Sequence, residues 1–579
     1  MTCCYFIPAC ISCEKSHGHI FSQFCKVLRK TTNKLTFELI FVFKLKMLIL
    51  SSCRLRRQIF LHIPLAFFLS ICVPQTNGAK ILFIFPLASK SMANIFEPLV
   101  KGLAERGHEL KVVTPVHFEI PNNKNYTELR PVSSDFFSQD YPDPFEIRRQ
   151  SKLFSFPVPF IVKGCHKVYE SAEFRNLVNE KFDLIVLNII YNDCFAGLVH
   201  KIGSPVILVS SLPPPTSFTQ IVGNAMPSSF IPIVVLSDGS DKMNFIQRTK
   251  NFLYNLYMIP VVDIWTRPPM EDIYREYLGQ DLPSVKEIYA NQVSMILMNS
   301  HYAVTSPRPL LPSIIEIGGI HCQPAKPLPK DLEDFATGAK DGFIVFSMGS
   351  IIKPSNMPES VRLAFVRTFA KLKQRVIWKW DKDEGMPDLP ANVKLVKWLP
   401  QQNVLGHPNI RLFITHGGLL STEEAVYHGV PVLGMPVFVD QDANMHQAEL
   451  LGFGVKGEIL DLTEEKLEPL IRRILEDPRY MKKAKELSTI FRDQPHTSLE
   501  RALYYTEYVI RHKGAYHLRS GAMELNLFQY HSVDVVLFLL SILLITAFIL
   551  IFIVKSLLRL LFSSVKIPKR QGGGKRKKT

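Results

Sequence analysis

One segment near the carboxyl end restricts the environments in which this chain can fold. The run Val535–Val554 contains 20 consecutive residues without a charge. A helix of that length spans about 30 Å, which matches the hydrocarbon core of a bilayer. A core helix of a soluble protein normally keeps a polar face, whereas this run is apolar almost throughout. We therefore expect residues 535–554 to form a transmembrane helix.

Basic residues follow this run immediately. Residues 555–579 carry nine Lys or Arg and no acid. Since basic flanks stay cytosolic, they predict a cytosolic tail and a lumenal body, the single-pass type I arrangement. Lys577 and Lys575, at the third and fifth positions from the end, resemble a dilysine-type retrieval signal for the endoplasmic reticulum. The alternative is a generic basic tail that binds anionic headgroups.

Residues 1–79 are expected to be an N-terminal extension with a signal peptide. Arg54, Arg56 and Arg57 precede the apolar run Ile59–Val73, and small and polar residues follow it. This order is typical of a signal peptide, with cleavage near Gly78. Either Met47 is the true start, which we favour, or the segment stays uncleaved as an anchor. The sequon at Asn125 is a candidate glycosylation site in a lumenal body.

The net charge of +16 is concentrated at the two ends of the chain. Residues 80–554 have a net charge of −1, so the body has no excess of basic residues for nucleic-acid binding. Seven of the ten cysteines precede residue 80. The other three, Cys165, Cys194 and Cys322, match no zinc spacing. They allow one disulfide, although free buried cysteines are the interpretation that we favour.

The body alternates short apolar runs with helical segments, twice over. Continuous apolar runs of this kind are typical of parallel strands that are covered on both faces. The expected strands in the first half are 81–85, 110–113, 182–187 and 206–209, with a helix over 96–106 that ends at Gly107. Those in the second half are 343–346, 376–378, 393–396, 411–414 and 430–433. We predict two doubly wound Rossmann-like domains that face a cleft, joined by the Pro- and Gly-rich segment 306–329.

Polar and aromatic residues cluster between residues 398 and 442. Thr415-His416-Gly417-Gly418 ends a predicted strand, and Ser421 and Glu424 lie at the start of the next helix. Glycines allow close approach of a ligand, and a helix N-terminus binds anions, so we expect a diphosphate site here. Trp398 offers a face for stacking a base, and Glu424 can accept hydrogen bonds from ribose hydroxyls. Asp440 and Gln441 could hold sugar hydroxyls.

The stretch from Trp398 to Asp442 resembles the signature of the UDP-glycosyltransferases (UDP-glucuronosyltransferases), in the form common to insect members. The similarity extends from Lys80 to the tail. It implies the GT-B fold and a UDP-sugar donor, with no cofactor and no metal. Residues 80–305 would then bind the acceptor and residues 330–530 the donor. The implied donor contacts are those of Ser350, Trp398, Gln401, His416, Gly418, Ser421, Glu424, Asp440 and Gln441. Vertebrate members often carry Asn where Leu420 stands.

The catalytic base that this resemblance implies is replaced here. Related sequences carry a His in the loop after the first strand, where this chain has Ser89-Lys90-Ser91-Met92. Methionine cannot accept a proton at neutral pH. His108 follows the helix and is expected to be structural. Asp193 is the tentative orienting carboxylate, although it can equally cap the helix that follows it.

Three functions remain open from the sequence. The first is inverting transfer of glucose or glucuronate from a UDP-sugar to a small lipophilic acceptor, and the insect-like form favours glucose. The second is a UDP-sugar-binding pseudoenzyme or a lipophile-binding protein. A dinucleotide oxidoreductase is the third, and it is disfavoured because no Gly-x-Gly-x-x-Gly follows the first strand. Apolar loops at 154–160 and 213–232 either form the acceptor pocket or cover the core. A homo-oligomer is possible.

Overall fold

We describe the fold from a computed structural model of the chain. It describes residues 78–120, 124–136, 141, 143–149, 158–233 and 240–563. The predicted signal peptide, most of the basic tail and residues 154–157 of one predicted acceptor loop lie outside these ranges.

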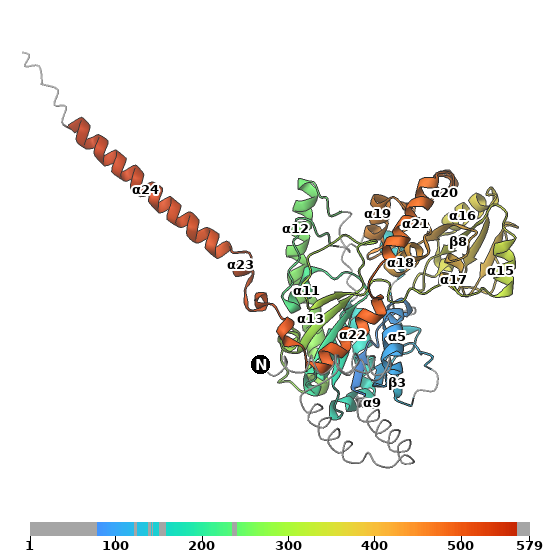
Figure 1. The fold of residues 1–579 in the computed structure, drawn as a ribbon, viewed down its shortest axis with the longest axis horizontal. Helices are drawn as coiled ribbons and strands as arrows, with labels where there is room; N and C mark the ends of the chain where they lie inside the picture. Colours follow the sequence, from blue (N-terminus) through green and yellow to red (C-terminus); the bar gives the residue numbers. More distant parts are fainter. Residues whose placement is uncertain are drawn as a thin grey trace, which may run out of the picture. The chain divides into compact units, whose positions relative to one another are not determined.

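Two parallel sheets form the body (Figure 1). The N-terminal sheet has the strand order β3-β2-β1-β4-β5-β6-β7, and the C-terminal sheet has the order β10-β9-β8-β11-β12-β13. The N-terminal strands are β1 (Lys80–Ile84), β2 (Glu109–Val113), β3 (Tyr126–Leu129), β4 (Leu184–Asn188), β5 (Val206–Ser210), β6 (Val293–Met298) and β7 (Ile314–Glu316). The C-terminal strands are β8 (Phe343–Ser347), β9 (Arg375–Lys379), β10 (Val393–Val396), β11 (Ile410–Thr415), β12 (Val432–Gly434) and β13 (Gly454–Lys456). Each order reverses beside its first strand, as in doubly wound folds.

Helices cover both faces of each sheet. In the N-terminal half they are α5 (Lys90–Glu105), α7 (Pro144–Arg149), α8 (Val158–Glu170), α9 (Ala172–Asn176), α10 (Ala196–Ile202), α11 (Thr216–Thr219), α12 (Phe245–Pro260), α13 (Arg267–Leu278) and α14 (Val285–Gln292). In the C-terminal half they are α15 (Lys330–Thr337), α16 (Glu359–Ala370), α17 (Gln401–Leu405), α18 (Leu419–His428), α19 (Gln441–Leu451), α20 (Glu464–Glu476) and α21 (Pro478–Arg492). Three helices follow these in the chain: α22 (Ser498–Arg511), α23 (Leu527–Tyr530) and α24 (Val533–Ser563).

Strand β1 shows why the parallel strands have continuous runs of apolar residues. Ile81 and Phe83 pack into the core on one face of the sheet, and Leu82 and Ile84 pack into the core on the other. Successive side chains of a strand point to opposite faces, so a strand with helices on both sides needs apolar residues at every position. The nine predicted strands are confirmed, with ends that differ by a few residues.

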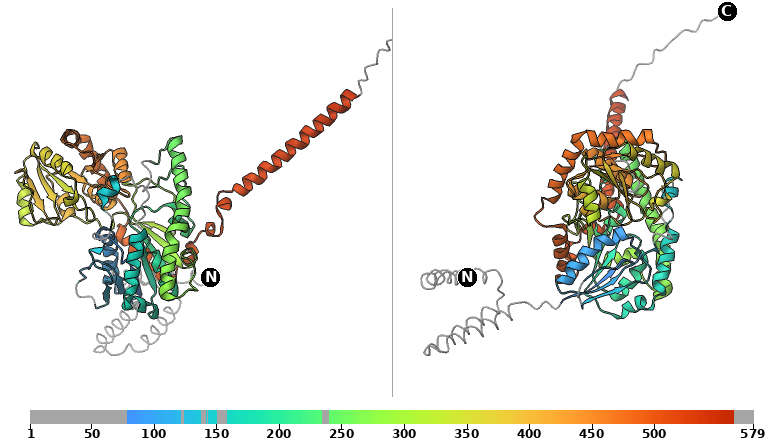
Figure 2. Two further views of the ribbon diagram at one scale, coloured as in Figure 1. Left: turned by 180° about the vertical axis from the view of Figure 1, so that it is seen from behind. Right: turned by 90° about the vertical axis from the view of Figure 1, so that its right-hand side faces the viewer.

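Helix α22 packs on the N-terminal domain, although we expected residues 330–530 to form one C-terminal unit. It lies beside α5 (Figure 1, Figure 2). A Cβ atom at Gly102 of α5 would come within 2.9 Å of Leu503, so the two helices are in close contact. Glu507 of α22 pairs with Arg106 at 2.9 Å. Apolar contacts on one face of α22 therefore attach the end of the body to the first domain.

His108 has a structural role, as expected. Its Nδ1 accepts a hydrogen bond from the Ala79 N–H at 3.1 Å, and its Nε2 lies 3.4 Å from Glu507. The predicted linker 306–329 differs from expectation, because it contains strand β7, which pairs with β6. The contacts of His108 hold the chain before β1 in place, and the pairing of β7 with β6 adds the end of the N-terminal domain to its sheet.

Two of the three body cysteines form a disulfide, which corrects the expectation of free thiols. Cys165 of α8 is bonded to Cys194, which follows β4, and Cys322 is free. The two residues are 29 positions apart in the chain. Their approach depends on how α8 packs over the end of β4, which the spacing of cysteines in the sequence does not reveal.

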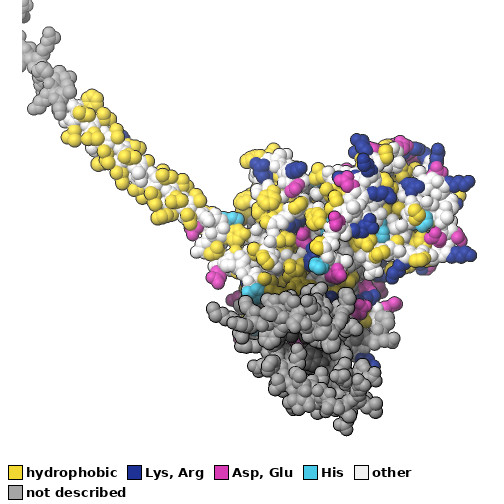
Figure 3. Space-filling view, in the orientation of Figure 1, with side chains coloured by type: hydrophobic (Ala, Val, Ile, Leu, Met, Phe, Trp, Pro, Cys, Tyr) yellow, Lys and Arg dark blue, Asp and Glu magenta, His cyan; other side chains and the backbone are white. Residues whose placement is uncertain are grey.

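Helix α24 is long and apolar enough to cross a membrane. Its side chains are exposed along its length, and apolar side chains cover it on the face shown in Figure 3. The helix contains the predicted span 535–554 and extends beyond it at the carboxyl end, past Lys555 and Arg559.

Candidate functional site

A cleft of about 1170 Å³ lies at the carboxyl ends of the two sheets. It is lined by loops that follow β1, β4 and β5 in the N-terminal domain and β8 to β12 in the C-terminal domain. Because the strands of each sheet are parallel, their carboxyl ends all deliver loops to one edge, where doubly wound folds bind ligands. All nine predicted donor-binding residues line this cleft.

The imidazole of His416 packs against the backbones of two glycines. A Cβ atom at Gly349 would lie 2.7 Å from the ring, and one at Gly418 would lie 2.5 Å from it. Gly349 also has φ +80°, which favours glycine. Burial, with repulsion from Lys379, lowers the pKa of His416 to about 4. The ring is therefore a neutral, fixed hydrogen-bonding group at neutral pH, with exposed Ser350 on the adjoining loop.

The N-terminus of α18 presents backbone N–H groups beside His416. Gly418 is the N-cap residue and provides no capping side chain. The Leu419 N–H is bonded to Asp440, which leaves those of Leu420 and Ser421 outside the hydrogen bonds of the helix. A helix N-terminus with free N–H groups and a positive dipole end is suited to an anion such as a diphosphate.

The side chain of Gln401 donates hydrogen bonds to both Glu424 and Ser421. The Gln401 amide donates to Glu424 Oε2 at 2.5 Å and to Ser421 Oγ at 3.1 Å. Burial raises the pKa of Glu424 to about 7, although Gln401 and Gln402 oppose this shift. Helix α17, which carries Gln401, therefore sets the position of the acid on α18.

Trp398 is 65% exposed and lines the cleft, so its ring is open to a ligand. The ammonium group of Lys90 lies 4.4 Å from the centre of that ring. Lys90 begins helix α5 of the N-terminal domain, so this contact crosses the cleft. An indole with a cation above it can stack a base on one face.

Asp440 and Gln441 lie at the start of α19 and shape the loop before it. The Gln441 side-chain oxygen accepts hydrogen bonds from the N–H groups of Val437 and Phe438, at 2.7 and 3.1 Å. Asn444 donates to Asp440 at 2.6 Å, and burial raises the pKa of Asp440. Val439 has φ 61°. Such strain in a β-branched residue is concentrated at functional sites.

Two cationic residues were missed by the sequence analysis. Lys90 is the first, above Trp398. Lys379 ends strand β9 and donates to the Gly349 carbonyl at 2.7 Å, and burial lowers its pKa. Their positions after β1 and at the end of β9 were visible, since both lie at carboxyl ends of expected strands. A diphosphate beside His416 would have both charges nearby.

A buried polar cluster supports α18 from behind. Glu423 is fully buried, and its Oε2 accepts a hydrogen bond from the Asn299 amide of the N-terminal domain at 3.0 Å. Burial raises the pKa of Glu423 to about 8 and lowers that of His321 to about 4. Both side chains are therefore neutral at pH 7, and the cluster is a hydrogen-bonded contact between the domains and not an ion pair.

Met92 lines the cleft in the first turn of α5. The helix begins six residues earlier than the predicted 96, because Ser89 caps it by accepting from the Met92 N–H at 3.3 Å. The side chain at the expected base position is therefore presented by a helix N-terminus. It remains a thioether and offers no proton acceptor.

The structure places Asp193 in the short helix η2 (Asp193–Phe195), outside the lining of the large cleft. Its carboxylate accepts from the Tyr289 hydroxyl at 2.9 Å and from Arg267 Nε at 3.4 Å. It lines a small cavity of about 20 Å³ under Tyr191 and Phe218. Buried polar partners on both oxygens indicate a structural role in holding α13 against the loop after β4.

A salt bridge connects α7 with the far side of the cleft. Arg148 pairs with Asp442 and Glu458 of the C-terminal domain, the latter at 2.6 Å. Phe145 of the same helix packs in the C-terminal core.

In the part of the chain that the structure describes, no group of three His, Cys, Asp or Glu side chains is arranged to hold a metal.

Comparison with known proteins decides the family. Residues 79–571 match the family described as "UDP-glucoronosyl and UDP-glucosyl transferase". The chain belongs to this family. The match covers both domains and α24, as the resemblance in the sequence implied.

Similar relatives come from insects and vertebrates. UDP-glucosyltransferase 2 of Dactylopius coccus is 34% identical over 508 residues, which are 86% of this chain and 97% of that protein. UDP-glucuronosyltransferase 2B7 of Homo sapiens is also 34% identical, over 82% of this chain and 92% of its own length. The family member described here is therefore similar to both glucosyl and glucuronosyl transferases.

The fold is that of known GT-B glycosyltransferases. The crystal structure of CalG4, the calicheamicin glycosyltransferase, matches with a TM-score of 0.52 at 17% identity. The alignment covers 75% of this chain and 99% of that one. The predicted fold class is thus confirmed.

Proposed function

We propose that this protein transfers a hexosyl group, glucose or glucuronate, from a UDP-sugar to a small lipophilic acceptor, with inversion at the anomeric carbon. One observation carries the proposal: His416 packs against the backbones of Gly349 and Gly418 beside the open N-terminus of α18. Trp398 and Glu424 line the same cleft. These groups match a base, a ribose and a diphosphate in one ligand.

The donor contacts follow from this arrangement. Trp398 stacks the uracil, and Glu424 binds the ribose hydroxyls. The diphosphate lies against His416 and the N-terminus of α18, with Lys90 and Lys379 nearby to balance its charge. Asp440, Gln441 and the remaining predicted residues Ser350, Gln401, Gly418 and Ser421 complete the site. No metal and no cofactor take part in the proposal.

The reaction is a direct displacement. An acceptor oxygen forms a bond to the anomeric carbon while the bond from that carbon to the diphosphate oxygen breaks. Attack from the face opposite UDP inverts the configuration. Negative charge develops on the departing diphosphate, where fixed N–H groups and cations stabilise it.

The acceptor proton has no obvious protein base, since Met92 occupies the expected position. We propose acceptors that ionise readily, phenols or carboxylic acids, whose proton passes to water. The similarity to a protein named UDP-glucosyltransferase supports glucose as the sugar, and that to a protein named UDP-glucuronosyltransferase keeps glucuronate open. The apolar residues Phe218 and Met258 of the cleft suit a lipophilic acceptor.

Met92, which cannot act as a base, is the one observation that favours a second, non-catalytic function. A donor site beside a cleft without a base could serve a UDP-sugar-binding pseudoenzyme or a lipophile-binding protein. The two functions predict different results for Met92→His, assayed in microsomes with UDP-glucose, UDP-glucuronate and a panel of phenols. Transferase function predicts measurable turnover that rises about 10²- to 10⁴-fold with the new base. Asn94→His, two residues further along α5 and also in the lining of the cleft, is the control. No product in any of these assays would favour the pseudoenzyme.

Donor binding is tested separately from turnover. UDP should raise the melting temperature of the purified protein, because a ligand that binds only the folded state stabilises it. His416→Ala and Trp398→Ala should each weaken UDP binding at least tenfold. Unchanged affinity in both variants would contradict the proposed site.

We further propose that the protein is a single-pass type I protein of the endoplasmic reticulum membrane, with its body in the lumen. The apolar helix α24 and the Cys165–Cys194 disulfide support this placement, because disulfides persist in oxidising compartments.

A further inference from the structure

Helix α12 (Phe245–Pro260) and the π-helical turn η4 (Val261–Thr266) expose an unusual amount of apolar surface. Phe245 is 73% exposed, Phe252 is 55% exposed and Trp265 is 62% exposed. Ile246, Leu253, Leu256 and Ile264 are also exposed. A contiguous apolar patch on the surface of a protein usually marks a site of interaction.

The exposed apolar residues lie on the side of α12 that the fold does not cover. Asn251, Met258 and Val262 are buried on the inner side. At about 100° per residue, Leu253 and Leu256 lie on the side of the helix opposite Asn251 and Met258, and Phe252 lies at the edge of that side. The helix therefore packs one side against its own domain and exposes a second side that is apolar.

Cations flank this outer side. The segment 242–266 contains Lys242, Arg248 and Lys250, and its one acid, Asp263 of η4, pairs with Arg267. The same helical geometry places Arg248 and Lys250 at opposite borders of the apolar side, and both are exposed. An apolar stripe between basic borders is typical of helices that lie in the interface of an anionic bilayer.

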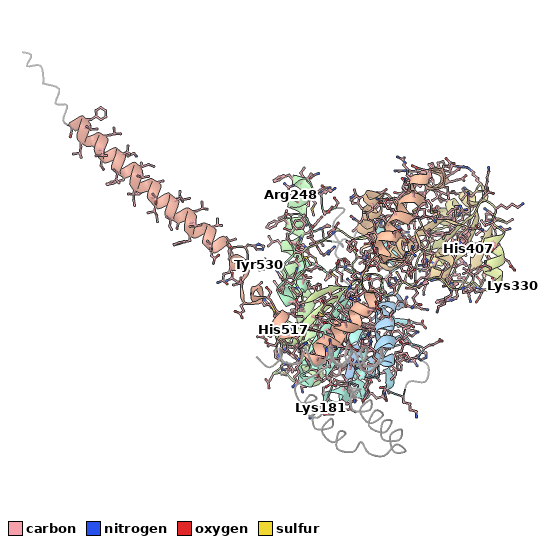
Figure 4. All side chains as sticks on the ribbon, in the orientation of Figure 1. Lys181, Arg248, Lys330, His407, His517 and Tyr530 are labelled. Carbon is pink, nitrogen blue, oxygen red and sulfur yellow. A yellow bond between two sulfur atoms is a disulfide. The ribbon has the colours of Figure 1, made fainter. Side chains whose placement is uncertain are left out.

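The loop that holds α12 also holds the segment leading into α24. The Asn251 amide donates to the carbonyls of Ser228 and Ile231, both at 2.7 Å. In the same loop, the Ala225 carbonyl accepts from the Tyr530 hydroxyl at 3.4 Å. Helix α24 begins at Val533, three residues after Tyr530. Figure 4 labels Arg248 on α12 and Tyr530 before α24.

We propose that α12 and η4 lie on the lumenal surface of the bilayer that α24 crosses. Phe245, Phe252, Leu256 and Trp265 enter the boundary between headgroups and acyl chains, and the flanking cations bind anionic headgroups. The inference rests on the proposed membrane span. It adds a second membrane contact, made by the acceptor domain itself.

This contact has a consequence for the acceptor. Tyr254 and Met258, on the inner side of α12, line the cleft. One helix therefore separates the bilayer surface from the proposed acceptor site. A lipophilic acceptor dissolved in the bilayer can reach the cleft along α12 without crossing bulk water.

Lipid photolabelling of the full-length chain tests the contact. The protein is reconstituted in nanodiscs of phosphatidylcholine, with or without phosphatidylserine, that contain a lipid with a diazirine in its acyl chain. After illumination, peptides are mapped by mass spectrometry. We expect adducts in residues 245–265 as well as in α24, and none in helix α16 of the other domain, which exposes Glu359 and Arg367. Adducts confined to α24 and its flanks would overturn the inference, and none in α24 would overturn the span as well.

Variants identify the residues that make the contact. The double substitution Phe252→Glu and Leu256→Glu should lower labelling of residues 245–265 at least fivefold. Ile490→Glu on α21, an exposed apolar residue of the other domain, is the matched control and should leave it unchanged. Arg248→Glu with Lys250→Glu should reduce labelling only with phosphatidylserine, by about fivefold per cation.

Two further readouts separate this inference from its alternatives. UDP should still raise the melting temperature of the α12 variants, since none of the substituted residues lines the cleft. If UDP does not raise the melting temperature of the wild-type protein, that result contradicts the proposed function and not the membrane contact. Cross-links between two copies at residues 245–265, without lipid adducts there, would show that α12 binds a second chain and would overturn the membrane contact.

Discussion

At the scale of single residues, the site depends on groups that are held neutral or held still by burial. His416 is confined by Gly349 and Gly418, and Glu424 by Gln401. Neutral buried groups keep their hydrogen-bonding geometry without the cost of a desolvated charge. The anionic ligand would then supply the charge of the site, and the exposed Trp398 would supply the stacking surface.

Gly349→Ala tests the confinement of His416. The new Cβ would lie 2.7 Å from the imidazole, on a residue with φ +80°, so the ring or the loop must move. We expect at least a tenfold loss of UDP affinity, measured by calorimetry, and a cost of about 1–2 kcal/mol in stability. Gly385→Ala is the control, because its Cβ would meet nothing within 4 Å. Equal UDP affinity in Gly349→Ala and wild type would contradict a role for this packing.

Glu423→Gln tests the buried contact between the domains. The fold raises the pKa of Glu423 from 4.5 to about 8, so it favours the protonated form. The stability that this form contributes is complete below pH 4.5 and is lost as the pH rises towards 8. The wild type should lose up to about 1.4 kcal/mol per pH unit in this window from Glu423 alone. The variant, which stays neutral, should lose less between pH 6 and 8.

Denaturant unfolding at pH 6 and pH 8 measures this difference. The exposed Glu384→Gln makes the same charge change elsewhere in the domain and should follow the wild type. Identical pH dependence in Glu423→Gln and wild type would show that the Glu423 carboxyl is not held protonated.

At the scale of elements, two links hold the N-terminal domain together over long distances in the sequence. Helix α22 packs across α5 near the end of the body, and the Cys165–Cys194 disulfide joins α8 to the loop after β4. That loop also carries Tyr191, which has φ 63° and lines the cleft. The disulfide therefore holds a strained loop of the site.

Removal of the disulfide should destabilise this domain. Cys165→Ala with Cys194→Ala opens a loop of 29 residues, for which chain entropy predicts a loss of about 3–4 kcal/mol. Chemical denaturation of the oxidised protein measures the change. Cys322→Ala removes a thiol without a disulfide and should cost less. A double variant as stable as the wild type would mean that the two thiols are not bonded in the protein.

At the scale of the whole molecule, the proposed topology places the cleft, the disulfide and the sequon on one side of the membrane. Asn125 is exposed and directly precedes strand β3. In a lumenal body it is accessible to glycosylation.

Asn125→Gln should remove one endoglycosidase-sensitive increment of mass from protein expressed in cells. The expected readout is a shift on a denaturing gel that endoglycosidase produces in the wild type and not in the variant. Asn392→Gln is a control outside any sequon. A wild-type chain that endoglycosidase does not shift would contradict the lumenal placement of this strand.

Much of the architecture could be predicted because it depends on local patterns. Buried parallel strands need apolar residues at every position, so β1 and β8 were visible as short apolar runs. Strands β3, β6, β7 and β13 were not predicted. Strands β7 and β13 have three residues each, and β3 is an edge strand with polar residues, so these three carry little pattern. Strand β6 is an apolar run of six residues and could have been predicted. The start of α5 was missed because the helix, capped by Ser89, begins at Lys90, six residues before its apolar periodicity becomes clear.

The residues of the candidate site also fall into those that the sequence predicted and those that only the structure shows. His416, Gly418 and Glu424 follow one another along a strand end and a helix, so their spacing predicted a common site. Lys90 follows an expected strand and could have been included, whereas Arg148 of α7 lies after no expected strand and no pattern in the sequence connects it to the cleft. Asp193 was proposed from its position alone, and the structure shows its partners, Arg267 and Tyr289.

The sequence by itself determined the two alternating halves, the apolar span and the grouping of His416, Gly418 and Glu424, because each depends on residues within a few turns or strands of one another. The tertiary structure decided which cysteines pair, that α22 returns to the first domain and that α12 exposes an apolar side beside the entry to α24. These depend on contacts between segments far apart in the chain, where burial and not sequence spacing selects the partner.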